Sequence, residues 1–154
     1  MKEVLTCHVE KAWVDYNGHM NDSEYARVFS MAVDRWMEQI GITADFRENE
    51  KYTIFTLENH LCYLAEANEG EALTVNLQLL DHDAKRAHIF FVMNNAEGDR
   101  VATSEQMLMG MDMEAGRPKS FPEPIINSID KIAKDQVEKE LPKEAGRTIG
   151  IRHK

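Results

Sequence analysis

The segment "VDYNGHMNDSEY", residues 14–25, carries most of the side chains in this sequence that could do chemistry together. Asp15 offers a carboxylate that can attack carbon or take a proton from water, and His19 offers an imidazole. Gly18 allows close approach of the backbone to a ligand. Asp, Asn and Gly are also ordinary turn formers, so the same residues could simply shape a turn. From the residues alone, both interpretations stay open.

A long amphipathic helix is predicted directly after this turn. Apolar residues recur at three- and four-residue steps from Tyr25 to Ile40. Asn21 followed by Glu24 resembles a capping box, and Gly41 suits the left-handed residue that ends a helix. The first N–H groups of a helix lack partners within it and concentrate about half a positive charge. The helix start can therefore stabilise an oxygen that becomes negative beside Asp15.

The remaining elements are predicted to be mostly strands. The last three are joined by short polar turns, which indicates an antiparallel meander. In the second strand one apolar face is expected, formed by Phe55, Leu57, Leu61 and Tyr63. A modest helix over about 125–140 and a basic end follow. The predicted strands cover residues 4–14, 52–64, 73–81, 86–95 and 100–112.

One strand, one long helix and four further strands predict an α+β fold in which an antiparallel five-stranded sheet wraps around the helix. We expect residues 1–122 to form this domain and residues 123–154 to form a C-terminal helix and tail packed on it or extending from it. The free sheet edge and outer face favour pairing with a second copy, as a homodimer or a dimer of dimers.

Bulk composition excludes several classes of function. A net charge of −9 argues against a nucleic-acid partner, which needs clustered Lys and Arg. No apolar run approaches the roughly 20 residues that cross a bilayer, and no secretory signal is expected. Cys7 and Cys62 fit no metal spacing and are expected to be reduced, half-buried thiols of a cytoplasmic protein. The histidines show no metal-binding pair, so no metal is expected.

The motif "DYNGHMN" at 15–21, directly ahead of the long helix, resembles the D-x-N-G-H-V-N motif of the 4-hydroxybenzoyl-CoA thioesterase family. The similarity continues through "YLAEANEGEALTV" and "VATSEQMLMGMDMEAGRPKSFP" and covers about residues 3–122. The phrases "TSEQMLMGMDMEAGR" and "EAGRTIGIR" further resemble the betainyl-CoA thioesterase branch, found alone or fused to carnitine dehydrogenases. The resemblance implies the hotdog fold and hydrolysis of a small acyl-CoA thioester, with no cofactor beyond the coenzyme A of the substrate.

The resemblance also implies roles for individual residues. Asp15 matches the catalytic aspartate, as nucleophile or general base, and the Asn17-Gly18-His19 segment would bring N–H groups and side chains to the thioester. Asp22 departs from the family pattern, in which many members carry Asn, and this carboxylate could favour a cationic acyl group. Aromatic rings could then enclose that cation, with Trp13 and Tyr16 the better candidates and Trp36, Tyr63 and the phenylalanines as further rings that could equally be core. The candidate substrate-binding residues are Trp13, Tyr16, Asn21, Glu58, Asn59 and His60.

Three alternatives stay open. The acyl group could be aromatic or fatty, carried on CoA or on a carrier protein. His19 would suit a dehydratase of the same fold, although the Asp15 motif speaks against it. The chain could also be a non-enzymatic binding protein for acyl-CoA or a quaternary amine. The cations that could meet CoA phosphates are Lys85, Arg86, Arg117, Lys119, Arg147, Arg152 and Lys154.

Overall fold

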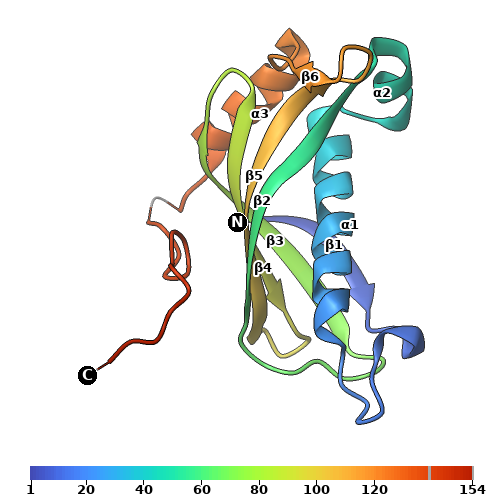
Figure 1. Cartoon of the computed structure of the whole chain (residues 1–154), viewed down its shortest axis with the longest axis vertical. Helices are drawn as coiled ribbons and strands as arrows, with labels where there is room; N and C mark the ends of the chain where they lie inside the picture. The colour runs from blue at the N-terminus through green and yellow to red at the C-terminus, as the bar shows by residue number, and fades with distance from the viewer. Residues whose placement is uncertain (139, 154) are drawn as a thin grey trace.

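A computed structural model describes residues 1–138 and 140–153 of the chain. The chain forms a mixed helix and strand arrangement with one long helix near its start (Figure 1). The elements are β1 (Lys2–His8), the 3-10 helix η1 (Lys11–Trp13), α1 (Asp22–Ile40), α2 (Ala44–Glu50), β2 (Tyr52–Tyr63), β3 (Ala72–His82), β4 (Arg86–Asn94), β5 (Arg100–Asp112), β6 (Arg117–Pro118) and α3 (Glu123–Asp135).

All strands join one antiparallel sheet in the order β1-β3-β4-β5-β2, and the two-residue β6 pairs with the end of β5. The predicted meander is confirmed, because β3, β4 and β5 are neighbours in both sequence and space. The sheet curls against α1, which lies on one side of it (Figure 1). The hotdog architecture is therefore confirmed, with β1 and β2 as the edge strands.

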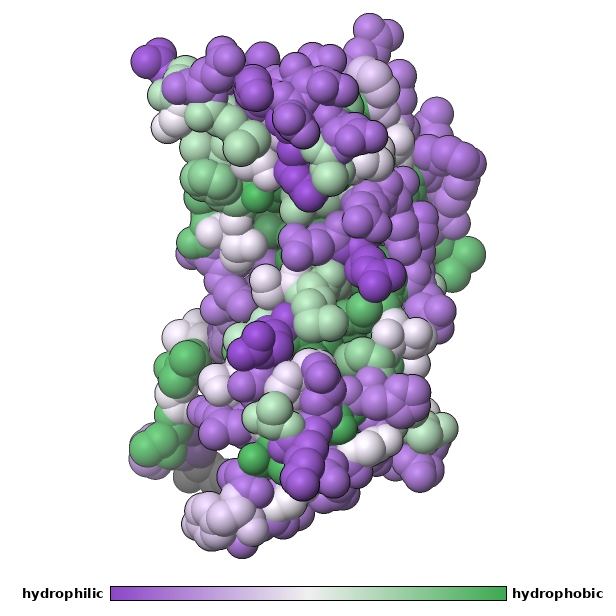
Figure 2. Space-filling model, turned by 90° about the vertical axis from the view of Figure 1, so that its right-hand side faces the viewer, coloured by the Kyte–Doolittle hydropathy of each residue, from purple (hydrophilic) through white to green (hydrophobic). Residues whose placement is uncertain are grey.

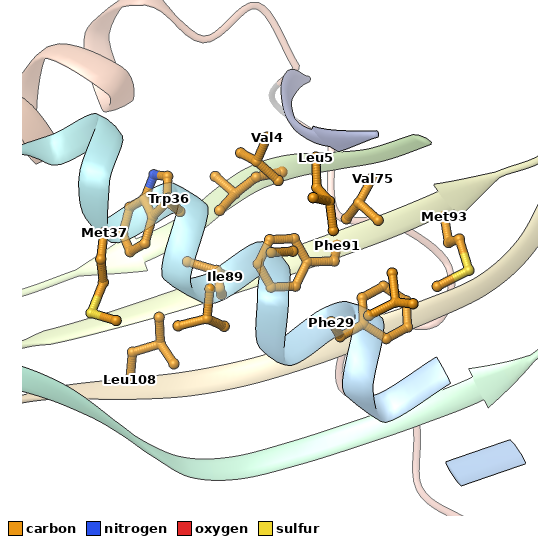
Figure 3. Close-up of a cluster of buried hydrophobic side chains, with 14 of the residues drawn as sticks. Val4, Leu5, Phe29, Trp36, Met37, Val75, Ile89, Phe91, Met93 and Leu108 are labelled. Atoms are coloured by element: carbon orange, nitrogen blue, oxygen red, sulfur yellow. The ribbon is translucent and has the colours of Figure 1, made fainter. Parts of the chain in front are cut away.

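The apolar stripe of α1 forms the centre of the core. Phe29 and Trp36 are fully buried, and the Phe29 ring stacks on Phe91 of β4 with centroids 5.9 Å apart and planes at 18°. Figure 3 shows these side chains between the helix and the strands, with Ile89 and Leu108 from the sheet facing them. Burial of this stripe fixes where the helix begins, and with it the position of the polar turn.

The predicted ends of α1 are confirmed, but the capping box is wrong. The Asn21 side chain accepts a hydrogen bond from the N–H of Ser23, and Gly41 is left-handed with φ 105°. Glu24 pairs with Arg27 instead of reaching back. The reason is that the Asn21 N–H already donates to the carbonyl oxygen of Trp13 at 2.9 Å, so no donor is left for Glu24.

The first strand is shorter than predicted. β1 ends at His8, and residues up to Trp13 form an extended link and the short η1, in which the Trp13 N–H donates to the Glu10 carbonyl oxygen at 2.9 Å. Both Val9 and Trp13 are buried. A regular strand would place these two residues on the same face but would carry the chain past the helix start, whereas the tight turn returns it to α1.

The predicted apolar face of β2 is wrong because the strand contains a bulge. Tyr52 and Ile54, at even-numbered positions, are buried in the core. Leu61, at an odd-numbered position, also packs partly against the core. The register with β5 shifts between Thr56 and Glu58, so one extra residue, Leu57, reverses the alternation. Phe55 and Leu57 are consequently 53% and 50% exposed.

The C-terminal segment begins with α3, which packs beside the end of α1 and joins the same core cluster. In α3, Ile125 and Ile129 are buried, and the helix ends at Asp135 rather than near 140. The predicted longer helix also covered Lys139, which lies outside the described residues. The helix stops because the Gln136 side chain binds the backbone of Leu79 in β3, accepting from its N–H at 2.8 Å and donating to its oxygen at 2.9 Å.

Two more contacts hold the segment that follows. Glu144 is only 3% exposed and forms a bidentate pair with Arg100, at 2.9 and 3.2 Å. Burial alone would raise the pKa of Glu144, but the Arg100 guanidinium lowers it below its ordinary value. The Gly146 N–H donates to Glu105 at 2.8 Å, and Glu105 also binds His88 at 2.6 Å.

In the described part of the chain, none of the helices has the length and apolar character needed to span a membrane. Cys7 and Cys62 are both free thiols of intermediate exposure, as predicted.

Truncation of the central core ring should be strongly destabilising. Phe29→Ala removes the ring that stacks on Phe91 and leaves a cavity, so we expect the free energy of unfolding to fall by about 3–5 kcal/mol. Ser30→Ala, on the exposed face of the same helix, serves as the control and should change it by less than about 0.5 kcal/mol. Urea denaturation followed by circular dichroism measures both; equal effects would contradict this account of the core.

Candidate active site

The Asp15 turn is a tight hairpin that leads directly into α1. Val14 and Met20 form an isolated bridge, and the Asp15 N–H donates to the His19 carbonyl oxygen at 2.9 Å. Gly18 closes the hairpin with φ 78°, a left-handed conformation that glycine adopts without steric cost, and its N–H donates to the Asp15 carbonyl oxygen at 3.0 Å. The backbone of this turn is therefore held by its own hydrogen bonds.

The Asp15 carboxylate is exposed and oriented by one of its two oxygens. Oδ1 accepts the N–H of Asn17 at 2.8 Å and the N–H of His19 at 3.2 Å. Among the described residues, no donor contacts Oδ2. One oxygen thus fixes the direction of the carboxylate while the other faces solvent, where it can meet a substrate or a water molecule.

This arrangement changes the role expected for the Asn17-Gly18-His19 segment. All three N–H groups already donate to Asp15, two to its carboxylate and one to its carbonyl oxygen. These N–H groups are therefore occupied in the single chain, and a contact between this segment and a thioester stays a prediction. Their observed contribution is to position the carboxylate.

His19 is tied to the loop that follows β2. Its Nδ1 lies 3.0 Å from Oδ1 of Asn68 and 3.3 Å from Oε2 of Glu66. Because both neighbours are acceptors, Nδ1 carries a proton and donates to them. The ring is partly exposed, so Nε2 is accessible beside the Asp15 turn.

The start of α1 supplies an unpaired donor. Asn21 caps the helix through Ser23, and Asp22 is its first residue. Among the hydrogen bonds of the described residues, the Asp22 N–H has no acceptor. This group is one of the helix's unsatisfied N–H groups, at the positive end of the helix dipole.

The two aromatic residues beside Asp15 lie in different environments. Trp13 is 7% exposed and belongs to the hydrophobic core, whereas Tyr16 is 97% exposed. Within one chain they therefore do not form a shared box. Tyr63 was among the rings expected to enclose a cation, whereas Tyr25 was assigned only to the apolar stripe of the helix; the two rings meet at the start of α1.

Glu58, Asn59 and His60 lie in the middle of β2, away from the contacts of the Asp15 turn, which reach residues 66–69. Asn59 accepts a hydrogen bond from buried Ser104 at 2.6 Å. Glu58 and His60 line a hollow of about 300 Å³ with His88, Glu105 and Arg147. The single chain thus does not bring residues 58–60 to Asp15.

A cavity larger than the hollow beside β2 does not coincide with this chemistry. It measures about 420 Å³ and is lined by residues of the N terminus, the far end of α1 and α3, among them Lys2, Gln39 and Lys131. Asp15 lies at the opposite end of α1. We therefore identify the candidate site from the oriented carboxylate and not from cavity size.

The candidate cations for CoA phosphates are scattered. Arg86 is paired with Asp83, whose pKa it lowers to about 2 together with the N–H of Lys85. Arg147 lies beside β2 and lines two hollows there. Lys154 lies outside the described residues.

Comparison with known proteins gives consistent results. Residues 9–129 match the family described as the thioesterase-like superfamily. The betainyl-CoA thioesterase of Pseudomonas aeruginosa is 37% identical over 155 residues, covering 98% of both chains. A Rhizobium L-carnitine dehydrogenase/betainyl-CoA thioesterase is 37% identical over 149 residues; the match covers 96% of this chain but 30% of that longer protein.

Solved structures agree with the sequence relatives. A Staphylococcus aureus protein, determined in complex with CoA, superposes with a TM-score of 0.93 at 35% identity, covering 98% of this chain and 96% of that one. The family match spans the Asp15 turn and every strand of the sheet except β1. The chain belongs to the thioesterase-like superfamily.

Proposed function

We propose that this protein is an acyl-CoA thioesterase in which Asp15 acts as nucleophile or general base. The observation that carries the proposal is the Asp15 carboxylate itself, with Oδ1 held by two backbone N–H groups and Oδ2 unbonded among the described residues. A carboxylate that only shaped the turn would not need an exposed second oxygen. The named thioesterase among its relatives, 37% identical over nearly the whole chain, supports the same reaction.

In the general-base route, Oδ2 takes a proton from water as the water oxygen attacks the thioester carbonyl carbon. The carbon–sulfur bond breaks, the electron pair leaves on sulfur, and the sulfur recovers a proton as free CoA. In the nucleophilic route Oδ2 forms a mixed anhydride with the acyl group, which water then hydrolyses. Both routes give one carboxylic acid and one thiol per water consumed.

Charge develops on the thioester oxygen in either route. The Asp22 N–H is our proposed donor to it, because it is unpaired at the helix start and is a fixed part of the backbone. Removing one preorganised donor of this kind typically costs about 10²–10³ in turnover. His19, with Nδ1 bound to Asn68 and Glu66, would offer Nε2 to a water or to the leaving group.

The substrate we propose is a small acyl-CoA, with betainyl-CoA as the specific candidate. Its support is the 37% identity with the Pseudomonas aeruginosa betainyl-CoA thioesterase over nearly the whole of both chains. In this proposal no cofactor takes part beyond the CoA of the substrate, and the protein works in the cytoplasm, in keeping with its two free thiols. A role in carnitine metabolism follows the names of the fused relatives.

We further propose a homodimer, or a dimer of dimers, formed along the edge strand β2. The support is the exposed apolar side chains on that strand, with Phe55 and Leu57 about half exposed next to unpaired backbone groups. The face that carries α1 is largely hydrophilic, with hydrophobic surface reaching its left border in Figure 2. We retain Trp13, Tyr16, Asn21 and residues 58–60 as candidate substrate contacts in such an assembly.

Asp15→Asn tests the catalytic role with little change of shape. The amide oxygen can still accept the N–H groups of Asn17 and His19, so the turn should persist, but the nucleophile or base is lost. We expect kcat for thiol release from betainyl-CoA to fall by about 10²–10⁴-fold, with an unchanged thermal transition. Asp34→Asn, on the exposed face of α1, is the matched control and should keep full activity.

Full turnover by the Asp15→Asn variant would refute the proposed mechanism. Binding of betainyl-CoA without thiol release, even by concentrated wild-type protein, would instead support a binding protein. In the nucleophilic route, water that opens the anhydride at the Asp15 carbonyl carbon leaves its oxygen in that side chain, so label found in Asp15 after a single turnover in ¹⁸O-labelled water identifies it as the nucleophile.

Leu57→Glu tests the proposed dimer. Its side chain is half exposed on the edge strand, so a charge should be tolerated by the fold of one chain but not by a β2–β2 seam. We expect light scattering to show a dimer or tetramer for the wild type and a smaller species for the variant. The same substitution at Val137, which is exposed on the C-terminal segment, should leave the oligomer intact. A monomeric wild type would contradict the seam.

A further inference from the structure

Two tyrosines meet at the start of α1. Tyr25 comes from the first turn of the helix and is buried, whereas Tyr63 comes from the last residue of β2 and is 50% exposed. Their ring centroids are 5.3 Å apart and their planes are nearly perpendicular, at 85°. The Tyr63 hydroxyl donates to the Asp22 carbonyl oxygen at 3.4 Å. The exposed ring is thus held in place against the residue that we propose as the oxyanion donor.

Carboxylates surround this pair. Burial raises the pKa of Tyr63, and the negative charge of Asp22 raises it further. Burial likewise raises the pKa of Tyr25, with added contributions from Glu66 and Glu71. Both phenols therefore stay neutral around pH 7, and the rings sit in a field of negative charge. A neutral aromatic face within a negative field is the environment that binds a large, weakly hydrated cation.

We infer that Tyr63, supported by Tyr25 and the Asp22 carboxylate, forms the subsite that selects a quaternary ammonium acyl group. The inference rests on the proposed thioesterase function and deepens it. With the thioester oxygen at the Asp22 N–H, an acyl group only one carbon long between carbonyl and nitrogen would place its trimethylammonium close to the same residue. Tyr63, hydrogen-bonded to the Asp22 carbonyl oxygen, lies at this same end of the helix and can therefore contact the trimethylammonium group.

Two positive charges oppose a cation here. The helix start itself is positive, but Asp22 and Glu24 lie in its first turn and offset it. Arg147 shares with Tyr63 a hollow of about 270 Å³ beside β2. Because that hollow also borders the tail, we assign Arg147 to the CoA portion, which is common to all CoA substrates, and not to the acyl group.

The test compares two CoA esters of nearly the same shape. In betainyl-CoA the acyl group ends in a trimethylammonium; in 3,3-dimethylbutanoyl-CoA the nitrogen is replaced by carbon and the charge is lost. The quantity measured is the ratio of kcat/KM between the two esters, for the wild type and for Tyr63→Leu, Tyr63→Phe, Asp22→Asn and Arg147→Gln. The oligomeric state of each variant is measured by light scattering.

We expect Tyr63→Leu to lower this ratio by about 3- to 30-fold, the range of a cation–aromatic contact, and Tyr63→Phe to keep it within about twofold. Asp22→Asn should lower the ratio by a similar factor, because the negative charge that favours the cation is lost. The backbone N–H that we propose as the oxyanion donor is unchanged in this variant. Arg147→Gln should alter both esters equally and leave the ratio unchanged.

An equal loss on both esters in Tyr63→Leu, or a loss that accompanies dissociation of the oligomer, would overturn the inference by showing a merely structural role. Wild-type preference for the neutral ester would also overturn it while leaving the thioesterase function intact. Hydrolysis of neither ester, by contrast, would count against the proposed function itself.

Discussion

The burial of one helix stripe against the concave face of the sheet determines the rest of this structure. The stacking of Phe29 on Phe91 and the enclosure of Trp36 fix the rotation and the height of α1 over the strands. Because the helix cannot slide, its first residue is placed at one end of the sheet. The Asp15 hairpin, which joins the helix without a spacer, inherits that position.

The chemistry at this end comes from backbone groups used in two ways. Three N–H groups of the hairpin turn inward and hold a single aspartate, while the first N–H of the helix stays without an acceptor among the described residues. One short segment thus supplies both an oriented anion and an electropositive donor. Such preorganisation requires no rearrangement when charge develops during a reaction, which is why a small acidic protein can rely on so few residues.

The sequence was sufficient for the elements whose periodicity is long and regular. The helix from Asp22 to Ile40 and strands β3, β4 and β5 were predicted nearly to their ends, because burial imposes a clear repeat on them. Prediction from the sequence was wrong at places where a single residue changes the local backbone geometry. The extra residue at Leu57 cannot be read from alternation, and the Trp13 carbonyl that takes the Asn21 N–H became visible only with the turn folded.

For the site, the motif led to Asp15 but not to the direction of its hydrogen bonds. The backbone N–H groups of Asn17 and His19 were expected to reach a substrate. In the single chain they donate to the Asp15 carboxylate, because a short polar side chain in a turn captures the nearest N–H groups. Tyr63 was expected among the rings for a cation, but its contact with Tyr25, 38 positions earlier in the chain, was not predicted. Contacts of that sequence separation follow from the sheet's topology and leave no local signature.

The bulge in β2 carries a consequence for how the length of this chain can vary. In a regular strand, loss of one residue reverses every side chain beyond it, and selection removes such changes. Here Thr56 and Glu58, on the two sides of Leu57, pair with consecutive residues of β5. Deletion of Leu57 alone would therefore straighten the strand, and every other side chain would stay on its present face of the sheet. Homologous chains one residue shorter at this point would therefore keep the same interior, and would differ only in the curvature of the edge.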